Sequence, residues 1–209
     1  MAKALATADW MSGSRMTVTF GLGSMRQEYD YLGVPVAERG AMADEYLEAL
    51  NELWTEDSPT YEGKYAQFRE IVFDPKPVQK PHLPIWIGGD SDAALLRAAK
   101  HGSGWIISYR MQPEDIPARL DYLKSRPEWQ DRPFDVMFGL GTTRLTIGHK
   151  PRNDPKARPG MSAQEIVDQL SHYKDLGVTV SSVPIPAMPD ADAYLEYAQW
   201  VMEEIKPKL

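Results

Sequence analysis

The sequence predicts an α/β protein built around a parallel β-sheet. A helix, a strand and a long helix open the chain, and from Pro84 onwards short apolar segments alternate with segments of helical periodicity. Strands that are joined through helices imply right-handed crossovers and parallel pairing, in either a doubly wound sheet or a barrel. No composition shift or linker divides the chain, so residues 1–209 are expected to form a single domain with five strands.

The first part of the chain carries the clearest periodicity. Ala2–Asp9 has helical spacing but begins without a capping residue, and Arg15–Gly21 is alternating and β-branched, which is typical of a strand. Ala37–Trp54 is predicted to be a helix, because its apolar residues share one face and its acidic residues lie opposite. The apolar residues are Ala43, Tyr46, Leu47, Leu50, Leu53 and Trp54, and the acidic ones are Glu45, Glu48 and Glu52.

The rest of the chain combines one irregular excursion with regular βα units. Between Glu56 and Pro81 the sequence is rich in Tyr, Phe, Gly and Pro and shows no helical repeat, which predicts a connection containing a short hairpin. The expected strands after it are Pro84–Gly88, Gly104–Ile107, a segment near Phe134–Leu140, and Gly177–Ser181. The expected helices are Asp92–Lys100, Pro113–Lys124, one opened by the capping box Ser162–Glu165 with Ile166, Leu170 and Tyr173 on its face, and Asp192–Ile205.

Composition excludes several classes of function. The chain has no cysteine, so disulfides, iron–sulfur clusters, thiolate zinc sites and a cysteine nucleophile are all absent. Lys and Arg number 23 against 30 Asp and Glu, and the resulting net charge of −7 repels nucleic-acid phosphates and acidic membranes. No apolar run approaches the roughly 18 residues of a membrane span, and the first residues lack a signal-peptide pattern. We therefore expect a cytoplasmic protein with no nucleic-acid or membrane partner.

Glycine-rich turns beside the predicted strands are the strongest candidate binding features. They are Gly21-Leu-Gly23, Gly88-Gly89-Asp90-Ser91 and the run Gly102–Trp105. Ligands of parallel α/β proteins bind at the carboxyl ends of strands, where helix amino termini and backbone N–H groups converge. A glycine can also serve only to permit a tight turn. We expect the glycine-bearing strand ends at Gly21, Gly88 and Gly104 to lie together at one end of the sheet, where they would form a single binding face.

The Gly88–Ser91 turn is open to two interpretations. Two glycines let a ligand approach the backbone and Ser91 can cap the following helix, so an anion could bind there. Asp90 and Asp92 already place negative charge at that helix start, which would repel a phosphate. The basic loop Arg144–Arg158 is similarly either an attractant for an anionic ligand tail or a solvated loop.

Common catalytic motifs are missing from the sequence. Gly21-Leu-Gly23 is not a dinucleotide fingerprint because Arg26 occupies the third glycine position, and there is no Walker A sequence, His-Glu-x-x-His helix or Gly-x-Ser-x-Gly elbow. The four histidines are scattered and form no metal-ligand set, so no metal is expected. His101 ends a predicted helix, where a positive imidazole would favour the helix dipole.

The order of motifs resembles the bacterial-luciferase-like oxidoreductases, which use FMN or the deazaflavin coenzyme F420. The resemblance is strong from Ala2 to about Ile107 and is one of topology afterwards. The segments that carry it are Ala2–Asp9, Ser12–Arg15, Gly21-Leu-Gly23, Glu28-Tyr29, Leu32–Pro35, Glu38–Gly40, Glu45–Leu50, Leu53–Thr55, Pro75–Gln79, Pro81–Gly89, Ala93–Leu95 and Gly104-Trp105.

This resemblance implies an incomplete (β/α)8 TIM barrel, because it begins at the helix after the third strand of the family's barrel. The predicted parallel strands would correspond to barrel strands 4 to 8, and about 80 to 100 residues of a typical barrel of about 250 would be absent. A five-stranded sheet cannot close, so its edges and inner face need a cover. A second copy of the chain, a separate amino-terminal partner and rearranged helices are the alternatives, and a homodimer is the expectation.

The resemblance also implies where FMN or F420 would bind. Gly21 and Gly23 would line the pocket, Gly88, Gly89 and Ser91 would touch the cofactor, and Gly104 and Trp105 would lie near it. In this family the ring carries the redox chemistry while the protein positions the ring and a small-molecule substrate. The catalytic residues are unknown. We therefore expect a luciferase-like flavin- or deazaflavin-dependent oxidoreductase or monooxygenase, which could be inactive as an isolated chain. The alternatives are a non-catalytic flavin-binding or assembly protein and a truncated product that fails to fold.

Overall fold

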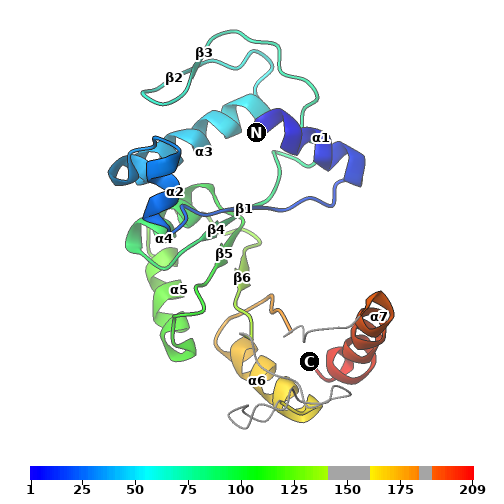
Figure 1. The fold of residues 1–209 in the computed structure, drawn as a ribbon. Coiled ribbons are helices and arrows are strands. Elements are labelled where there is room, and N and C mark those ends of the chain that lie inside the picture. Colours follow the sequence, from blue (N-terminus) through cyan, green and yellow to red (C-terminus); the bar gives the residue numbers. More distant parts are fainter. Residues whose placement is uncertain (141–160, 184–189) are drawn as a thin grey trace. The chain divides into compact units, whose positions relative to one another are not determined.

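The computed structural model describes residues 1–140, 161–183 and 190–209 (Figure 1). Their Cα positions group into two compact units. Unit 1 comprises Met1–Ile106 and Asp121–Asp135, and unit 2 comprises Ile107–Leu120 and the described part of Val136–Leu209. The single-domain organisation stays a prediction.

Unit 1 contains the first βα units of the fold. Its elements are α1 (Ala2–Ser12), β1 (Val18–Phe20), α2 (Arg26–Tyr31), the 3-10 turn η1 (Val36–Glu38), α3 (Arg39–Thr55), the hairpin of β2 (Tyr61–Glu62) and β3 (Gln67–Phe68), β4 (Ile85–Gly88), α4 (Asp92–His101) and β5 (Gly104–Ile106). The hairpin confirms the excursion expected between Glu56 and Pro81. Helix α2 was not predicted, because its six residues are too few to show an apolar period.

The parallel sheet confirms the predicted fold class. Its strand order is β1-β4-β5-β6, where β6 is Asp135–Met137. Val18 pairs with Ile85 and Phe20 with Ile87, while Trp86 pairs with Gly104 and Gly88 with Ile106. The fold is α/β and corresponds to an incomplete (β/α)8 barrel. The expected strand at Arg15–Gly21 is only three residues long, as β1.

The two faces of the sheet in unit 1 differ in burial. Ile85 and Ile87 of β4 are buried, as are Leu95 and Ala98 of α4, so this face and the helix share the apolar core. Trp86 points to the opposite face because side chains alternate along a strand, and it is partly exposed. Its indole Nε1 is buried without an acceptor among the described residues.

Helix α3 connects the core of unit 1 with the hairpin. Its apolar face buries Ala43, Leu47, Leu50 and Trp54, which confirms most of the predicted face. Its acidic face holds the hairpin: the Glu45 carboxylate accepts hydrogen bonds from the backbone N–H of Lys64, Tyr65 and Ala66, at 3.0, 2.5 and 2.6 Å. Glu52 accepts from Thr60 N at 3.0 Å and Glu48 from the Tyr61 hydroxyl at 2.9 Å. The acidic residues opposite the apolar face therefore bind the β2–β3 hairpin to α3.

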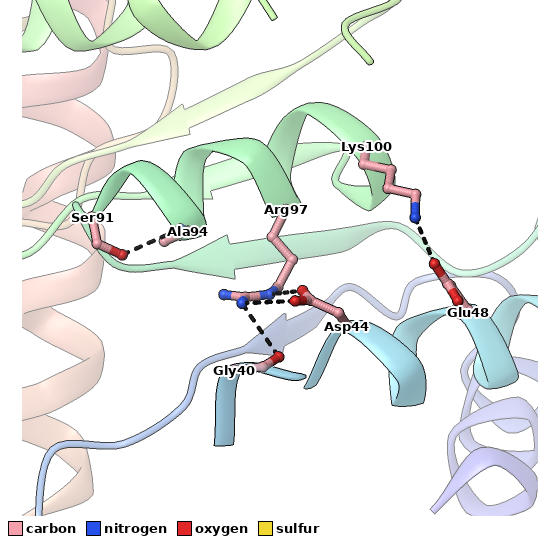
Figure 2. A network of polar contacts seen from close by, with 7 residues as sticks. All are labelled: Gly40, Asp44, Glu48, Ser91, Ala94, Arg97 and Lys100. Atoms are coloured by element: carbon pink, nitrogen blue, oxygen red, sulfur yellow. Dashed lines mark hydrogen bonds and ion pairs between the residues drawn. The ribbon is translucent and has the colours of Figure 1, made fainter. Parts of the chain in front are cut away.

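Figure 2 shows the polar contacts between α3 and α4. The Arg97 guanidinium is buried and donates through Nε to Asp44 Oδ1 and through Nη2 to Asp44 Oδ2, the latter at 3.3 Å. Lys100 Nζ lies 2.5 Å from Glu48 Oε1 at a more exposed position. Desolvation by burial lowers the pKa of His101, the last residue of α4, which opposes the positive imidazole expected there.

Unit 2 contains the 3-10 turn η2 (Pro113–Asp115), the start of α5 (Ile116–Lys124), most of β6, α6 (Ala163–Asp175), α7 (Ala191–Trp200), the π-helical turn η3 (Val201–Ile205) and the 3-10 turn η4 (Lys206–Lys208). The capping box is confirmed: Ser162 Oγ accepts from Glu165 N, and the Glu165 carboxylate accepts from Ser162 N at 2.7 Å. Ile166, Leu170 and Tyr173 are buried as expected.

The expected fifth strand, Gly177–Ser181, is reduced to one parallel bridge between Met137 and Val180. Its hydrogen bonds nevertheless continue beyond the bridge, from Phe138 N to Val180 O at 3.1 Å and from Leu140 N to Ser182 O at 3.2 Å. The segment is therefore extended beside β6 without a regular ladder. The predicted closing helix, Asp192–Ile205, is α-helical only to Trp200.

Candidate functional site

The carboxyl ends of β1 and β4 lie side by side and carry the first two glycine turns. A Cβ atom placed on Gly88 would lie 3.9 Å from the Cα of Gly21 and 3.8 Å from the carbonyl oxygen of Phe20. Among the described residues, no atom lies within 4 Å of the position that a Gly21 Cβ would occupy. This edge of the sheet, which we call the glycine edge and define as Gly21–Gly23 and Gly88–Ser91, is therefore backbone that another molecule can approach.

The Gly88–Ser91 turn has a defined conformation. Gly89 has φ +121°, a value that residues with a side chain rarely adopt, and its N–H donates to Ile106 O at 3.2 Å. Ser91 is the N-cap of α4, and its Oγ accepts from Ala94 N at 3.2 Å (Figure 2). The predicted cap is confirmed, and this acceptor lone pair of Ser91 is used within the fold.

The turn after β1 is held by Tyr29, which the sequence placed in a family motif but not among the expected binding residues. The Tyr29 hydroxyl of α2 donates to the carbonyl oxygen of Leu22, and Gly23 has φ +74°. The tyrosine ring lies 4.0 Å from the position of a Gly23 Cβ. The sequence holds no signal for this contact, because α2 has no visible periodicity and the contact spans a turn.

Gly104 does not lie at the glycine edge. It is the first residue of β5 and pairs with Trp86, whereas Ile106 at the other end of β5 pairs with Gly88. The expectation that Gly21, Gly88 and Gly104 share one end of the sheet is therefore wrong for Gly104. A Cβ at Gly104 would lie 2.5 Å from Cδ1 of Trp86, so the glycine is needed for packing against that indole.

Trp105 lies in β5, next to the Gly88–Ser91 turn of the glycine edge. Its side chain has no exposed surface, and its indole Nε1 donates to the carbonyl oxygen of Gly89 at 2.8 Å. Trp105 therefore contacts the Gly88–Ser91 turn from within the core of unit 1. The other predicted binding residues, Gly21, Gly23, Gly88, Gly89 and Ser91, come together at the glycine edge, and their role in cofactor binding stays a prediction.

Two features are absent from the described parts of the chain. Within residues 1–140, 161–183 and 190–209, no three His, Asp or Glu side chains are grouped as a metal would require. The same ranges contain no helix with the length and apolarity needed to cross a membrane. The basic loop Arg144–Arg158 lies outside the described residues.

Comparison with known proteins identifies the family. The sequence profile described as luciferase-like monooxygenase matches residues 1–149, which is more than half of the chain. The chain belongs to this family. An uncharacterized protein of Mycobacterium tuberculosis is 30% identical over 199 residues, covering 94% of this chain and 62% of the relative. The FMNH2-dependent dimethylsulfone monooxygenase of Pseudomonas putida is 33% identical over 128 residues, covering 60% of this chain and 35% of that enzyme.

Solved structures of low sequence identity share the fold of this luciferase-like chain. The monooxygenase RslO1 from Streptomyces bottropensis matches with a TM-score of 0.81 at 19% identity, over 99% of this chain and 72% of that one. An F420-dependent secondary alcohol dehydrogenase matches with a TM-score of 0.73 at 15% identity, over 100% and 73%. The chain spans about 62% of the length of its mycobacterial relative, so the activity of the whole relative is not carried over by the match.

Proposed function

We propose that this chain is a flavin- or deazaflavin-dependent oxidoreductase of the luciferase-like group that binds the ring of FMN or F420 at the glycine edge. A relative in the same family is named as FMNH2-dependent, and a structure with the same fold is named as F420-dependent. The observation that carries the proposal is the adjacent pair of glycine turns at the carboxyl ends of β1 and β4, where ligands of parallel α/β proteins bind.

The residues at this edge fit a planar ring. Gly21 and Gly88 present backbone without side chains, so a flat group can lie against them. The bound ring would supply hydride transfer or oxygen activation. The role of the chain is to orient the ring through the backbone of its two turns and to present it to a small-molecule substrate. The catalytic groups, the homodimer and the cytoplasmic location stay predictions.

Titration of the purified chain with FMN, reduced FMN and F420 tests the proposal. We expect at least one of them to bind with a Kd below about 100 μM, about −5.5 kcal/mol. Gly21→Ala should weaken that binding at least tenfold, because its Cβ would occupy the space above the edge. It should change the free energy of unfolding by less than about 0.5 kcal/mol, because the Cβ meets no atom of the described chain.

Gly40→Ala is the matched control, since it adds a methyl group to α3 at an ordinary contact distance of 3.6 Å from Arg97 Nη2. It should leave cofactor affinity unchanged. Failure of all three cofactors to bind the wild-type chain would contradict the proposal. Binding of a cofactor without any substrate-dependent oxidation would instead support the non-catalytic flavin-binding alternative.

A further inference from the structure

Each turn of the glycine edge has one carbonyl group bound by the polar tip of an aromatic side chain. Trp105 Nε1 donates to Gly89 O at 2.8 Å, and the Tyr29 hydroxyl donates to Leu22 O. The two donors come from different elements, β5 and α2, and reach neighbouring turns. The indole of Trp105 is fully buried, so water does not compete for this hydrogen bond.

Fixing a carbonyl also fixes the amide that follows it. In a planar trans peptide the C=O and the next N–H point in opposite directions. A Gly89 carbonyl turned towards Trp105 therefore directs the N–H of Asp90 away from that indole. In the same way, the Leu22 carbonyl bound by Tyr29 directs the N–H of Gly23 away from the tyrosine.

Gly89 depends on such a contact more than an ordinary residue does. Without a side chain it has no packing of its own to hold its backbone, and glycine loses more conformational freedom on ordering than other residues. Its N–H is bound by Ile106 O and its carbonyl by Trp105, so both peptide units around it are held. Both partners belong to β5, which couples the conformation of the turn to the neighbouring strand.

We propose that Trp105 and Tyr29 are positioning residues, which set the direction of the peptide groups in the two glycine turns and thereby the affinity of the edge for a planar redox ring. Neither residue needs to touch the ring. The effect on affinity rests on the proposed function, whereas the effect on the turns does not. Trp105 was expected to lie near the cofactor, and it acts here through the carbonyl of Gly89.

The chain offers a matched control for each residue. Trp54 is also buried, and its Nε1 donates to a backbone carbonyl, that of Ala2, at 3.2 Å. The Tyr61 hydroxyl donates to Glu48 at 2.9 Å, away from the glycine edge. Trp54→Phe and Tyr61→Phe therefore remove the same chemical groups from hydrogen bonds to Ala2 and Glu48, which lie outside the glycine edge.

Amide hydrogen exchange of the chain without cofactor is the first test. In Trp105→Phe the Gly89 amide, which donates to Ile106 O, should exchange at least tenfold faster than in the wild type. In Tyr29→Phe the amide chemical shifts of Gly23 and Ser24 should change, because the peptide group that Tyr29 holds is released. Trp54→Phe and Tyr61→Phe should leave the Gly89 exchange rate and these chemical shifts unchanged. Unchanged exchange at Gly89 in Trp105→Phe would overturn its positioning role, and if that variant fails to fold, Tyr29→Phe decides the proposal through these chemical shifts.

Cofactor affinity is the second test, using FMN, reduced FMN and F420. Trp105→Phe should raise Kd at least tenfold, while Trp54→Phe should not, although the loss of one hydrogen bond should lower Tm by about 2–4 °C in each. Equal affinity of the two variants would overturn the link between turn geometry and binding. If the wild type binds none of the three cofactors, the proposed function fails, and the exchange experiment still decides whether Trp105 positions the turn.

Discussion

Unit 1 has two polar regions that differ in the groups that organise them. At the glycine edge, neutral donors of Trp105 and Tyr29 hold backbone carbonyls, and no side-chain charge takes part in those bonds. Around α3, charged groups make the contacts: Asp44 pairs with the buried Arg97, and Glu45 binds three backbone N–H groups of the hairpin. Changes around α3 are therefore expected to act on stability, and changes at the glycine edge on ligand affinity.

The largest effect is expected at the ion pair between α3 and α4. Asp44→Ala should lower the free energy of unfolding by about 2–4 kcal/mol, because it leaves the guanidinium of Arg97 buried with the Gly40 carbonyl, 3.4 Å away, as its remaining acceptor among the described residues. The Asp44 side chain is 52% exposed, which keeps the effect below that of a fully buried pair. Denaturant unfolding measures it.

The control for this change is Glu62→Ala, which breaks the pair with Arg69 at 3.7 Å between two largely exposed side chains. It should change the free energy of unfolding by less than about 1 kcal/mol. Cofactor affinity of Asp44→Ala, measured where the chain is still folded, should equal that of the wild type. A loss of affinity comparable with that of Trp105→Phe would remove the distinction between the two regions.

Loss of the carboxylate that binds the hairpin should destabilise the chain less than loss of the Asp44–Arg97 pair, and its effect should be confined to the hairpin. Glu45→Ala should lower the free energy of unfolding by about 1–2 kcal/mol, since it leaves three backbone N–H groups without their carboxylate acceptor. Glu52→Ala, which removes the acceptor of a single N–H, should cost about 0.5–1 kcal/mol. Exchange of the amides of residues 64–66 should accelerate in Glu45→Ala alone, and equal effects of the two variants would contradict this graded role.

The smallest effect is a dependence of stability on pH that arises from His101. Burial lowers its pKa in the folded chain, with Lys100 and Arg97 acting in the same direction and Glu48 and Asp44 in the opposite one. The unfolded chain therefore binds a proton first, so stability is full above pH of about 6.5 and falls as the pH decreases from there towards the folded pKa. Denaturant unfolding between pH 8 and pH 5.5 measures the fall.

His101→Leu should flatten the stability profile in that range, because it removes the buried imidazole. Glu48 provides an internal reference, because hydrogen bonds from Lys100 and Tyr61 lower its pKa. Its stabilising contribution is therefore full above pH of about 4.5 and is lost only below it, outside the range in which His101 titrates. An unchanged slope in His101→Leu between pH 6.5 and 5.5 would assign the dependence to another group.

Local signals in the sequence were sufficient where one element decides its own geometry. Ser91 caps α4 and Ser162 opens α6 as predicted, because a hydroxyl one turn before a backbone N–H satisfies that donor within four residues. The buried face of α3 was predictable for the same kind of reason, since the period of the helix places Leu47, Leu50 and Trp54 together.

Long-range contacts were not predictable in this way. The motif Gly104-Trp105 looks like the other glycine turns, yet the register of β5 against β4 places Gly104 beside Trp86 at the far end of the strand. Register is set by pairing between strands, and nothing within residues 102–107 encodes it. The contact of Tyr29 with Leu22 is equally invisible, because it depends on how a six-residue helix packs over a turn.

The amino-acid sequence by itself determined the α/β class, the caps, the helix faces and the family, because these depend on short-range periodicity and on an ordered series of motifs. Only the tertiary structure decided which glycines meet: Gly21 and Gly88 become neighbours through parallel pairing of β1 and β4, which lie more than 60 residues apart. It also showed that Trp105, which was expected near the cofactor, is a buried donor to Gly89, since the direction of a side chain follows from its place in the sheet.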